Sequence, residues 1–208
     1  MDNYAVALDR AREAFLRYDR QKLLDRKGVV LEGQFLTFPF AGAKTFVDLE
    51  TGTVRFSYPD GTSWEGGFGE GLSVYDWLCD GQEDAAASGE FCPVYSLPGV
   101  YVGGNGLMLK NDTLSQMADR DPDRFRWACR FLGGEPWPAG DIGFRIPLFC
   151  DLSAVLKFYH SDEEFPAQLT LLWDRNTLRF VRYETVYYIA GVLMSRLKTL
   201  MGRHSAQK

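Results

Sequence analysis

The spacing of apolar residues changes along this chain, and the change limits the possible folds more than any other feature of the sequence. Near the start, apolar residues recur at intervals of three and four, at Tyr4, Leu8, Ala11, Phe15 and Tyr18. This spacing predicts one amphipathic helix, which we expect to end at Lys27-Gly28. From Gln34 onward, apolar residues alternate with other residues, which is the period of a β-strand.

Alternating runs gather in two strand-rich regions. The first region contains runs at 36–40, 45–49 and 54–58, with a turn-forming sequence at 50–53 between the last two runs and another at 59–61 after the third. The second region contains runs at 144–148, 154–158 and 169–173. Short connections of this kind are typical of antiparallel strands rather than of parallel strands joined by helices.

Helices are predicted before, between and after these regions. A short helix is expected at 72–79, and a central helical pair at 113–119 and after Asp121-Pro122, where Asp can cap a helix and Pro suits its first turn. A last helix has a stripe of apolar residues at Val186, Ala190, Leu193, Leu197 and Leu200. The predicted class is α+β, with an antiparallel sheet built from two strand-rich regions and flanked by amphipathic N- and C-terminal helices and the central pair.

Size and charge exclude several functional classes. A chain of 208 residues predicts a single domain over residues 1–208, with a disordered tail from about residue 202. With 23 basic and 28 acidic residues and no basic patch, we expect no nucleic-acid partner. The longest apolar run, 186–194, is too short to cross a membrane, and no apolar leader follows Met1, so we expect a cytoplasmic protein.

The cysteines do not form a recognisable site. Cys79, Cys92, Cys129 and Cys150 lack the paired spacing of zinc and iron–sulfur ligands. We therefore expect buried free thiols in a reducing compartment, and no metal site is predicted from them.

Acidic residues near predicted strand ends are the candidate ligand-binding residues. The six positions are Asp162, Glu163 and Glu164 between two strands, Asp174 after the second of these strands, Glu184 at the start of the last helix, and Asp141 before the region's first strand. Converging carboxylates can bind a hard cation or raise one another's pKa for acid–base chemistry. The same residues can equally cap turns and helix N-termini, and His160 beside them is interpreted as a surface residue at a strand end.

The sequence around this acidic segment resembles a known family. The run Phe-Tyr-His-Ser-Asp-Glu-Glu-Phe-Pro-Ala at 158–167, the Leu-Leu-Trp-Asp that ends at Asp174, and Glu184 at the start of a last amphipathic helix resemble the domain-of-unknown-function 3786 family. The resemblance covers most of the chain and implies an origin in anaerobic bacteria or archaea, without an established activity. Some members carry an added four-cysteine segment like the iron–sulfur module of corrinoid proteins, which implies anaerobic cofactor metabolism. This chain lacks that segment and departs from the family pattern at Trp173 and Thr185.

Three functional hypotheses follow. The leading one is a binding module that holds a small-molecule cofactor or a protein partner in anaerobic metabolism, with the acidic residues among Phe165, Trp173 and Tyr187. One alternative is an enzyme, a metal-assisted hydrolase that uses Asp162, Glu163, Asp174 and Glu184. The other is an oligomeric structural or interaction subunit with exposed aromatic residues. The sequence identifies neither the ligand nor the cofactor.

Overall fold

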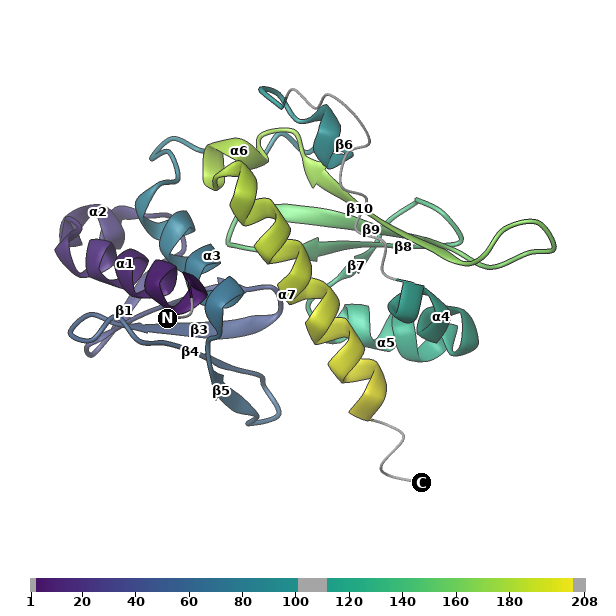
Figure 1. Cartoon of the computed structure of the whole chain (residues 1–208), viewed down its shortest axis with the longest axis horizontal. Coiled ribbons are helices and arrows are strands. Elements are labelled where there is room, and N and C mark those ends of the chain that lie inside the picture. The colour runs from purple at the N-terminus through teal and green to yellow at the C-terminus, as the bar shows by residue number, and fades with distance from the viewer. Residues whose placement is uncertain (1–2, 101–111, 204–208) are drawn as a thin grey trace.

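A computed structural model describes residues 3–100 and 112–203 (Figure 1). Within these ranges the strands form two antiparallel sheets of five strands each, and helices precede, separate and follow them, so the α+β prediction is confirmed. No helix of the described residues combines the length and the apolar character needed to cross a membrane.

The first sheet is a meander in which each strand pairs with the next along the chain. Its strands are β1 (Val30–Glu32), β2 (Phe35–Phe40), β3 (Ala43–Asp48), β4 (Val54–Ser57) and β5 (Ser63–Glu65). The predicted turn at 50–53 is confirmed, because the Asp48 carboxylate accepts hydrogen bonds from the backbone N–H groups of Glu50 and Thr51 at 2.7 and 2.9 Å. The two three-residue edge strands, β1 and β5, were not predicted.

The second sheet has three longer strands and two very short edge strands. Its strands lie in the order β6 (Phe91–Cys92), β10 (Gln168–Asp174), β9 (Ser153–Tyr159), β8 (Ile142–Pro147) and β7 (Glu135–Pro136). The loop of 160–167 between β9 and β10 projects from the body of the protein (Figure 1). The three longer strands match the three alternating runs of the sequence.

The helices match most predictions but not the first. The helices are α1 (Asn3–Arg17), α2 (Arg20–Asp25), α3 (Phe68–Cys79), α4 (Asp112–Arg120), α5 (Pro122–Phe131), α6 (Thr177–Phe180) and α7 (Tyr183–Gly202), with a 3-10 turn at Val94–Ser96. The prediction of one helix up to Lys27-Gly28 is wrong. The Asp19 carboxylate accepts a hydrogen bond from the Gln21 N–H at 2.8 Å and starts α2 separately.

Three further sequence predictions concern a helix cap, the cysteines and the C-terminal tail. The Asp121 cap is confirmed, with the Arg124 N–H donating to its carboxylate at 2.9 Å. All four cysteines lie in the described ranges and are free, but Cys129 is buried whereas Cys79, Cys92 and Cys150 are half-buried. The predicted tail falls largely on 204–208, outside the described residues.

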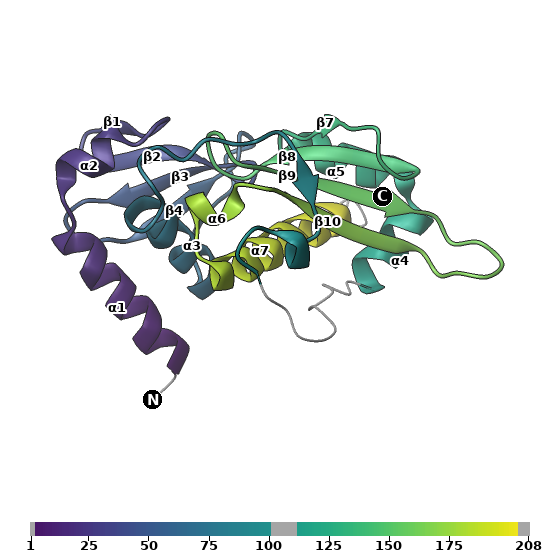
Figure 2. The ribbon, with the colours of Figure 1, turned by 90° about the horizontal axis from the view of Figure 1, so that it is seen from above.

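The two sheets lie side by side, and helices cover one face of this layer (Figure 2). The alternating apolar residues of β2 and β9 point into the same core, with Leu36, Phe40, Ala154 and Phe158 fully buried. Helix α7 crosses the covered face and contacts α3, α4 and α5. Its predicted apolar stripe is buried along its whole length, so one helix closes the core of both sheets.

The sheets meet at the β2–β3 turn. The backbone N–H of Ala41 in this turn donates to the Leu148 carbonyl after β8, at 2.7 Å, and the Phe40 and Phe149 rings stack with centroids 4.4 Å apart. Ala41 adopts a positive φ of 45°, which is unusual for a residue other than glycine. The turn must therefore be held in place by its surroundings.

Arg196 of α7 supplies that restraint. Its side chain is 5% exposed, and its Nη1 donates hydrogen bonds to the carbonyl oxygens of Phe40 and Ala41. Its Nη2 donates to Glu70 Oε1 at 2.8 Å, which joins α7 to the first turn of α3. The guanidinium therefore links two helices to the turn where the sheets meet.

Aspartate 76 fixes the N-terminal end of the same helix. The α7 N-cap residue, Arg182, has no capping side-chain bond of its own, and its backbone N–H donates to the Asp76 carboxylate of α3 at 2.7 Å. Burial raises the pKa of Asp76. Helices α3 and α7 are thus tied at two places, by Asp76 near one end and by the Glu70–Arg196 pair further along.

Replacing Arg196 by Met should lower the free energy of unfolding by roughly 3–5 kcal/mol, because Glu70 loses its ion-pair partner and two buried carbonyl oxygens each lose a hydrogen bond. Urea denaturation followed by circular dichroism measures this change. The double variant Arg196→Met/Glu70→Gln should lose less than the sum of the two single variants, because the pair is coupled. A loss below about 1 kcal/mol for Arg196→Met would contradict the proposed restraint.

Candidate functional site

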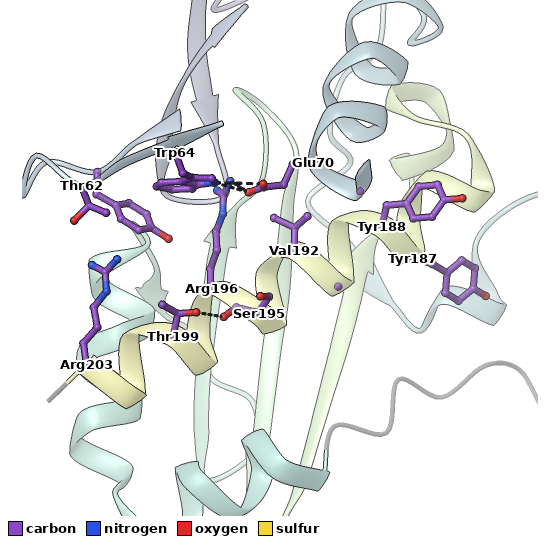
Figure 3. Close-up of a pocket in the computed structure, with 13 residues that line it drawn as sticks. Thr62, Trp64, Glu70, Tyr187, Tyr188, Val192, Ser195, Arg196, Thr199 and Arg203 are labelled. Carbon is purple, nitrogen blue, oxygen red and sulfur yellow. Dashed lines mark hydrogen bonds and ion pairs between the residues drawn. The ribbon is translucent and has the colours of Figure 1, made fainter. Parts of the chain in front are cut away.

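A groove of about 580 Å³ runs beside α7 and is a candidate binding site (Figure 3). One wall is α7 itself. The other wall is formed by residues at the end of the β4–β5 hairpin and by the first turn of α3. Asp76 and Arg196 join α3 to α7, so contacts of the folded core fix the positions of the two walls of the groove.

The α7 wall contains a ridge of residues spaced four apart, Tyr187, Gly191, Ser195, Thr199 and Arg203, and beside it lie Tyr188, Val192 and Arg196. Neighbours at this spacing are adjacent on the helix surface, and because four residues turn a helix by about 400°, the ridge winds slowly around α7. With a rise of 1.5 Å per residue, the ridge is roughly 24 Å long. The groove is therefore elongated, with tyrosine at one end and arginine at the other (Figure 3).

Aromatic residues of the first sheet form much of the opposite wall. The Trp64 ring lies 4.8 Å from Tyr58 and 5.5 Å from Phe56, measured between ring centroids. Its indole N–H donates to the Glu70 carboxylate at 3.1 Å, and the Arg196 guanidinium lies 5.2 Å from its ring centroid. This wall is rigid because each of its groups has several partners.

The ionisable groups of the groove are neutral or paired. Glu70 pairs with Arg196 at 2.8 Å, and Arg203 pairs with Asp60 beside the groove at 3.2 Å. Burial, followed by the hydrogen bond between the Tyr187 and Tyr183 hydroxyls, raises the pKa of Tyr187 to about 12. Burial also raises the pKa of Tyr58. Both phenol groups therefore stay protonated at neutral pH and can donate a hydrogen bond.

Gly191 occupies a position where glycine lowers the stability of the helix. It lies inside a 20-residue helix, where glycine is less favourable than alanine by roughly 1 kcal/mol. A Cβ atom added there would meet nothing within 4 Å, so packing within the described chain does not require the glycine. Its missing side chain instead widens the groove.

Replacing Gly191 by Ala should therefore raise the free energy of unfolding by about 0.5–1 kcal/mol, measured by urea denaturation. Gly71→Ala is the matched control, since it also adds a methyl group inside a helix, but that Cβ would lie 2.6 Å from Leu8 Cδ1. The control should gain less or lose stability. A loss of stability in Gly191→Ala would show that packing within the chain does require this glycine.

None of the six acidic residues predicted from the sequence to bind a ligand lines the groove. Asp162 folds the tip of the β9–β10 loop, since its carboxylate accepts hydrogen bonds from the N–H groups of Glu164 and Phe165 at 2.9 and 2.7 Å. Glu163 and Glu164 are exposed on the same loop. Asp141 lies at the base of this loop, where its carboxylate accepts from the His160 N–H at 2.8 Å.

Asp174 and Glu184 are not brought to that loop. Asp174 is at the far end of the seven-residue strand β10, roughly 20 Å from the loop at the usual rise of a strand. It is 1% exposed, and its carboxylate accepts hydrogen bonds from the N–H groups of Ser88, Gly89 and Asn176. Glu184 is exposed in the first turn of α7.

This separation removes the geometric basis of the hydrolase hypothesis. That hypothesis requires carboxylates from the loop, from the end of β10 and from α7 to converge on one ion. Among the described residues, no group of three or more His, Cys, Asp or Glu side chains could hold a metal ion. A ligand-binding role for the loop residues stays a prediction.

Sequence reasoning missed the groove because its walls come from distant segments. The apolar stripe of the last helix predicts only the face that packs in the core. A signal was nevertheless present, because Gly191, Ser195 and Thr199 form a row of small residues at a spacing of four.

Comparisons with known proteins give one match. A family model described as "Domain of unknown function (DUF3786)" matches residues 19–196. No curated protein and no solved structure matches the chain. The matched range contains most residues that line the groove, whereas Thr199 and Arg203 lie beyond it.

Proposed function

The chain belongs to the DUF3786 family of domains of unknown function, and on that premise we propose that it is a binding module that holds a small organic molecule in the groove beside α7. The groove carries this proposal. Its volume of about 580 Å³ is typical of a small-molecule site, and aromatic walls with a few placed polar groups suit such a ligand. The proposal keeps the cofactor-binding hypothesis and moves its site from the acidic loop to α7.

Glu70 is held in the wall of the groove by contacts within the protein. Its carboxylate accepts hydrogen bonds from Arg196, from the Trp64 indole and from the Gly67 backbone N–H. Because its oxygens already have these partners, Glu70 acts as part of the rigid wall.

Filling the groove should abolish binding without unfolding the protein. Gly191→Leu places a side chain in the open space beside α7, whereas Gly202→Leu makes the same change on the same helix at a position that does not line the groove. Each protein is purified without oxygen, incubated with small metabolites extracted from an anaerobic bacterium, and examined by native mass spectrometry. We expect the wild type and Gly202→Leu to retain a bound molecule and Gly191→Leu to lose it.

Circular dichroism serves as the folding control for both variants. Retention of the same molecule by a folded Gly191→Leu protein would place the binding site elsewhere. If the wild type retains no molecule at all, the small-molecule proposal is wrong.

A protein partner that docks on the β9–β10 loop is the second candidate function, and one observation favours it. Phe165 is 59% exposed at the tip of this projecting loop, beside the exposed carboxylates of Glu163 and Glu164. An exposed aromatic side chain on an ordered turn can anchor a protein interface. The alternative of an oligomeric subunit stays a prediction, which size-exclusion chromatography tests.

Replacing Phe165 by Ser should weaken such an interaction strongly while leaving the thermal unfolding midpoint unchanged, because the ring contributes little buried area. Cross-linking followed by mass spectrometry in cells identifies the partner and its contact residues. Tyr95→Ser is the matched control, since Tyr95 is 53% exposed on another part of the surface. Equal cross-linking of the Phe165→Ser and wild-type proteins would argue against this interface.

A further inference from the structure

The charges along the α7 groove cancel in pairs. Arg196 and Glu70 neutralise each other inside the wall, and Arg203 has Asp60 as its ion-pair partner at 3.2 Å. Arg203 also lies 5.7 Å from the centroid of the Tyr58 ring. The C-terminal end of α7 adds a partial negative charge near Arg203, which further disfavours an anion there. A charged ligand would lose hydration in this groove without meeting an unpaired opposite charge.

Hydroxyl groups are the polar groups that remain for a ligand. In the described part of the chain, no group forms a hydrogen bond with the Ser195 hydroxyl, which lines the groove and is exposed. The Thr199 hydroxyl donates to the Ser195 carbonyl at 2.9 Å, so its oxygen can still accept a hydrogen bond. These groups can pair with hydroxyl, carbonyl or N–H groups of a neutral molecule.

The shape of the groove favours rings. Gly191 leaves bare backbone in the middle of the α7 ridge, and Tyr58, Trp64, Tyr187 and Tyr188 supply aromatic surface along the groove (Figure 3). Contacts between aromatic rings contribute about 0.5–1.5 kcal/mol beyond the area that they bury. The length of the ridge, roughly 24 Å, has room for more than one ring.

We propose that the ligand of the α7 groove is a neutral, elongated, ring-containing molecule that forms hydrogen bonds with the Ser195 and Thr199 hydroxyls. This inference rests on the proposed binding function and specifies its ligand class. It follows from the paired charges, the available hydroxyls and the open position at Gly191.

Three fluorescent probes test the charge of the ligand class. They are N-phenyl-1-naphthylamine, which is neutral, 8-anilinonaphthalene-1-sulfonate, which is an anion, and thioflavin T, which is a cation. Fluorescence titration of the intact protein should give a dissociation constant for the neutral probe about ten times lower than for either charged probe. Gly191→Leu should weaken binding of the neutral probe about tenfold, and Gly202→Leu should leave it unchanged.

Two variants, each of which removes one charge at the end of the groove, test the effect of charge on anionic and on cationic probes separately. Asp60→Asn leaves Arg203 without its counter-charge and keeps the acceptor for the Thr62 N–H, so it should tighten binding of the anionic probe. Arg203→Gln should tighten binding of the cationic probe by the same argument. For each variant, the change in affinity for the charged probe should exceed any change in affinity for the neutral probe. Arg175→Gln is the matched control, because Arg175 pairs with Glu90 at 3.1 Å outside the groove.

The outcomes separate the ligand class from the binding function. Tighter binding of a charged probe that is still sensitive to Gly191→Leu would overturn the neutral class and leave the binding function standing. If no probe responds to Gly191→Leu but native mass spectrometry detects a metabolite that does, the class is again wrong and the function stands. If neither experiment responds to Gly191→Leu, both proposals fail.

Discussion

The buried guanidinium of Arg196 is the interaction on which the rest of this structure depends. Removing a charge from water is costly, and three oxygen atoms and three aromatic rings offset that cost here. Two of the oxygens belong to the strained β2–β3 turn, and that turn is also hydrogen-bonded to the second sheet. Without this side chain, α7, α3 and the junction of the sheets would lose their common contact.

The same interaction determines where a ligand could bind. Arg196 holds α7 against α3 and the first sheet, and the side of α7 that faces away from the core becomes one wall of the groove. Small residues on that side leave space, whereas apolar residues on the opposite side fill the core. One helix thus combines a structural face with a candidate binding face.

Long periodic segments were predictable from the sequence, and short or non-local features were not. The runs that became β2, β3, β8, β9 and β10 extend over enough residues for a period of two to be recognised. Strands of two or three residues, such as β1 and β5, have too few positions to show a period. The carboxylates of Asp162 and Asp174 are close in sequence, but β10 carries them to opposite ends of the sheet. The groove depends on residues of β5 and α7, which are brought together only by the complete fold.

The position of α7 in the chain has a consequence for biosynthesis. Every strand in the described ranges precedes α7, so both sheets leave the ribosome before the helix that covers their apolar face. Antiparallel hairpins can form early from neighbouring segments, but the part of their inner faces that α7 covers stays in contact with water until α7 has been synthesised. The nascent chain therefore exposes this apolar surface until its last helix emerges, and a chaperone that shields such surface would act on it before then.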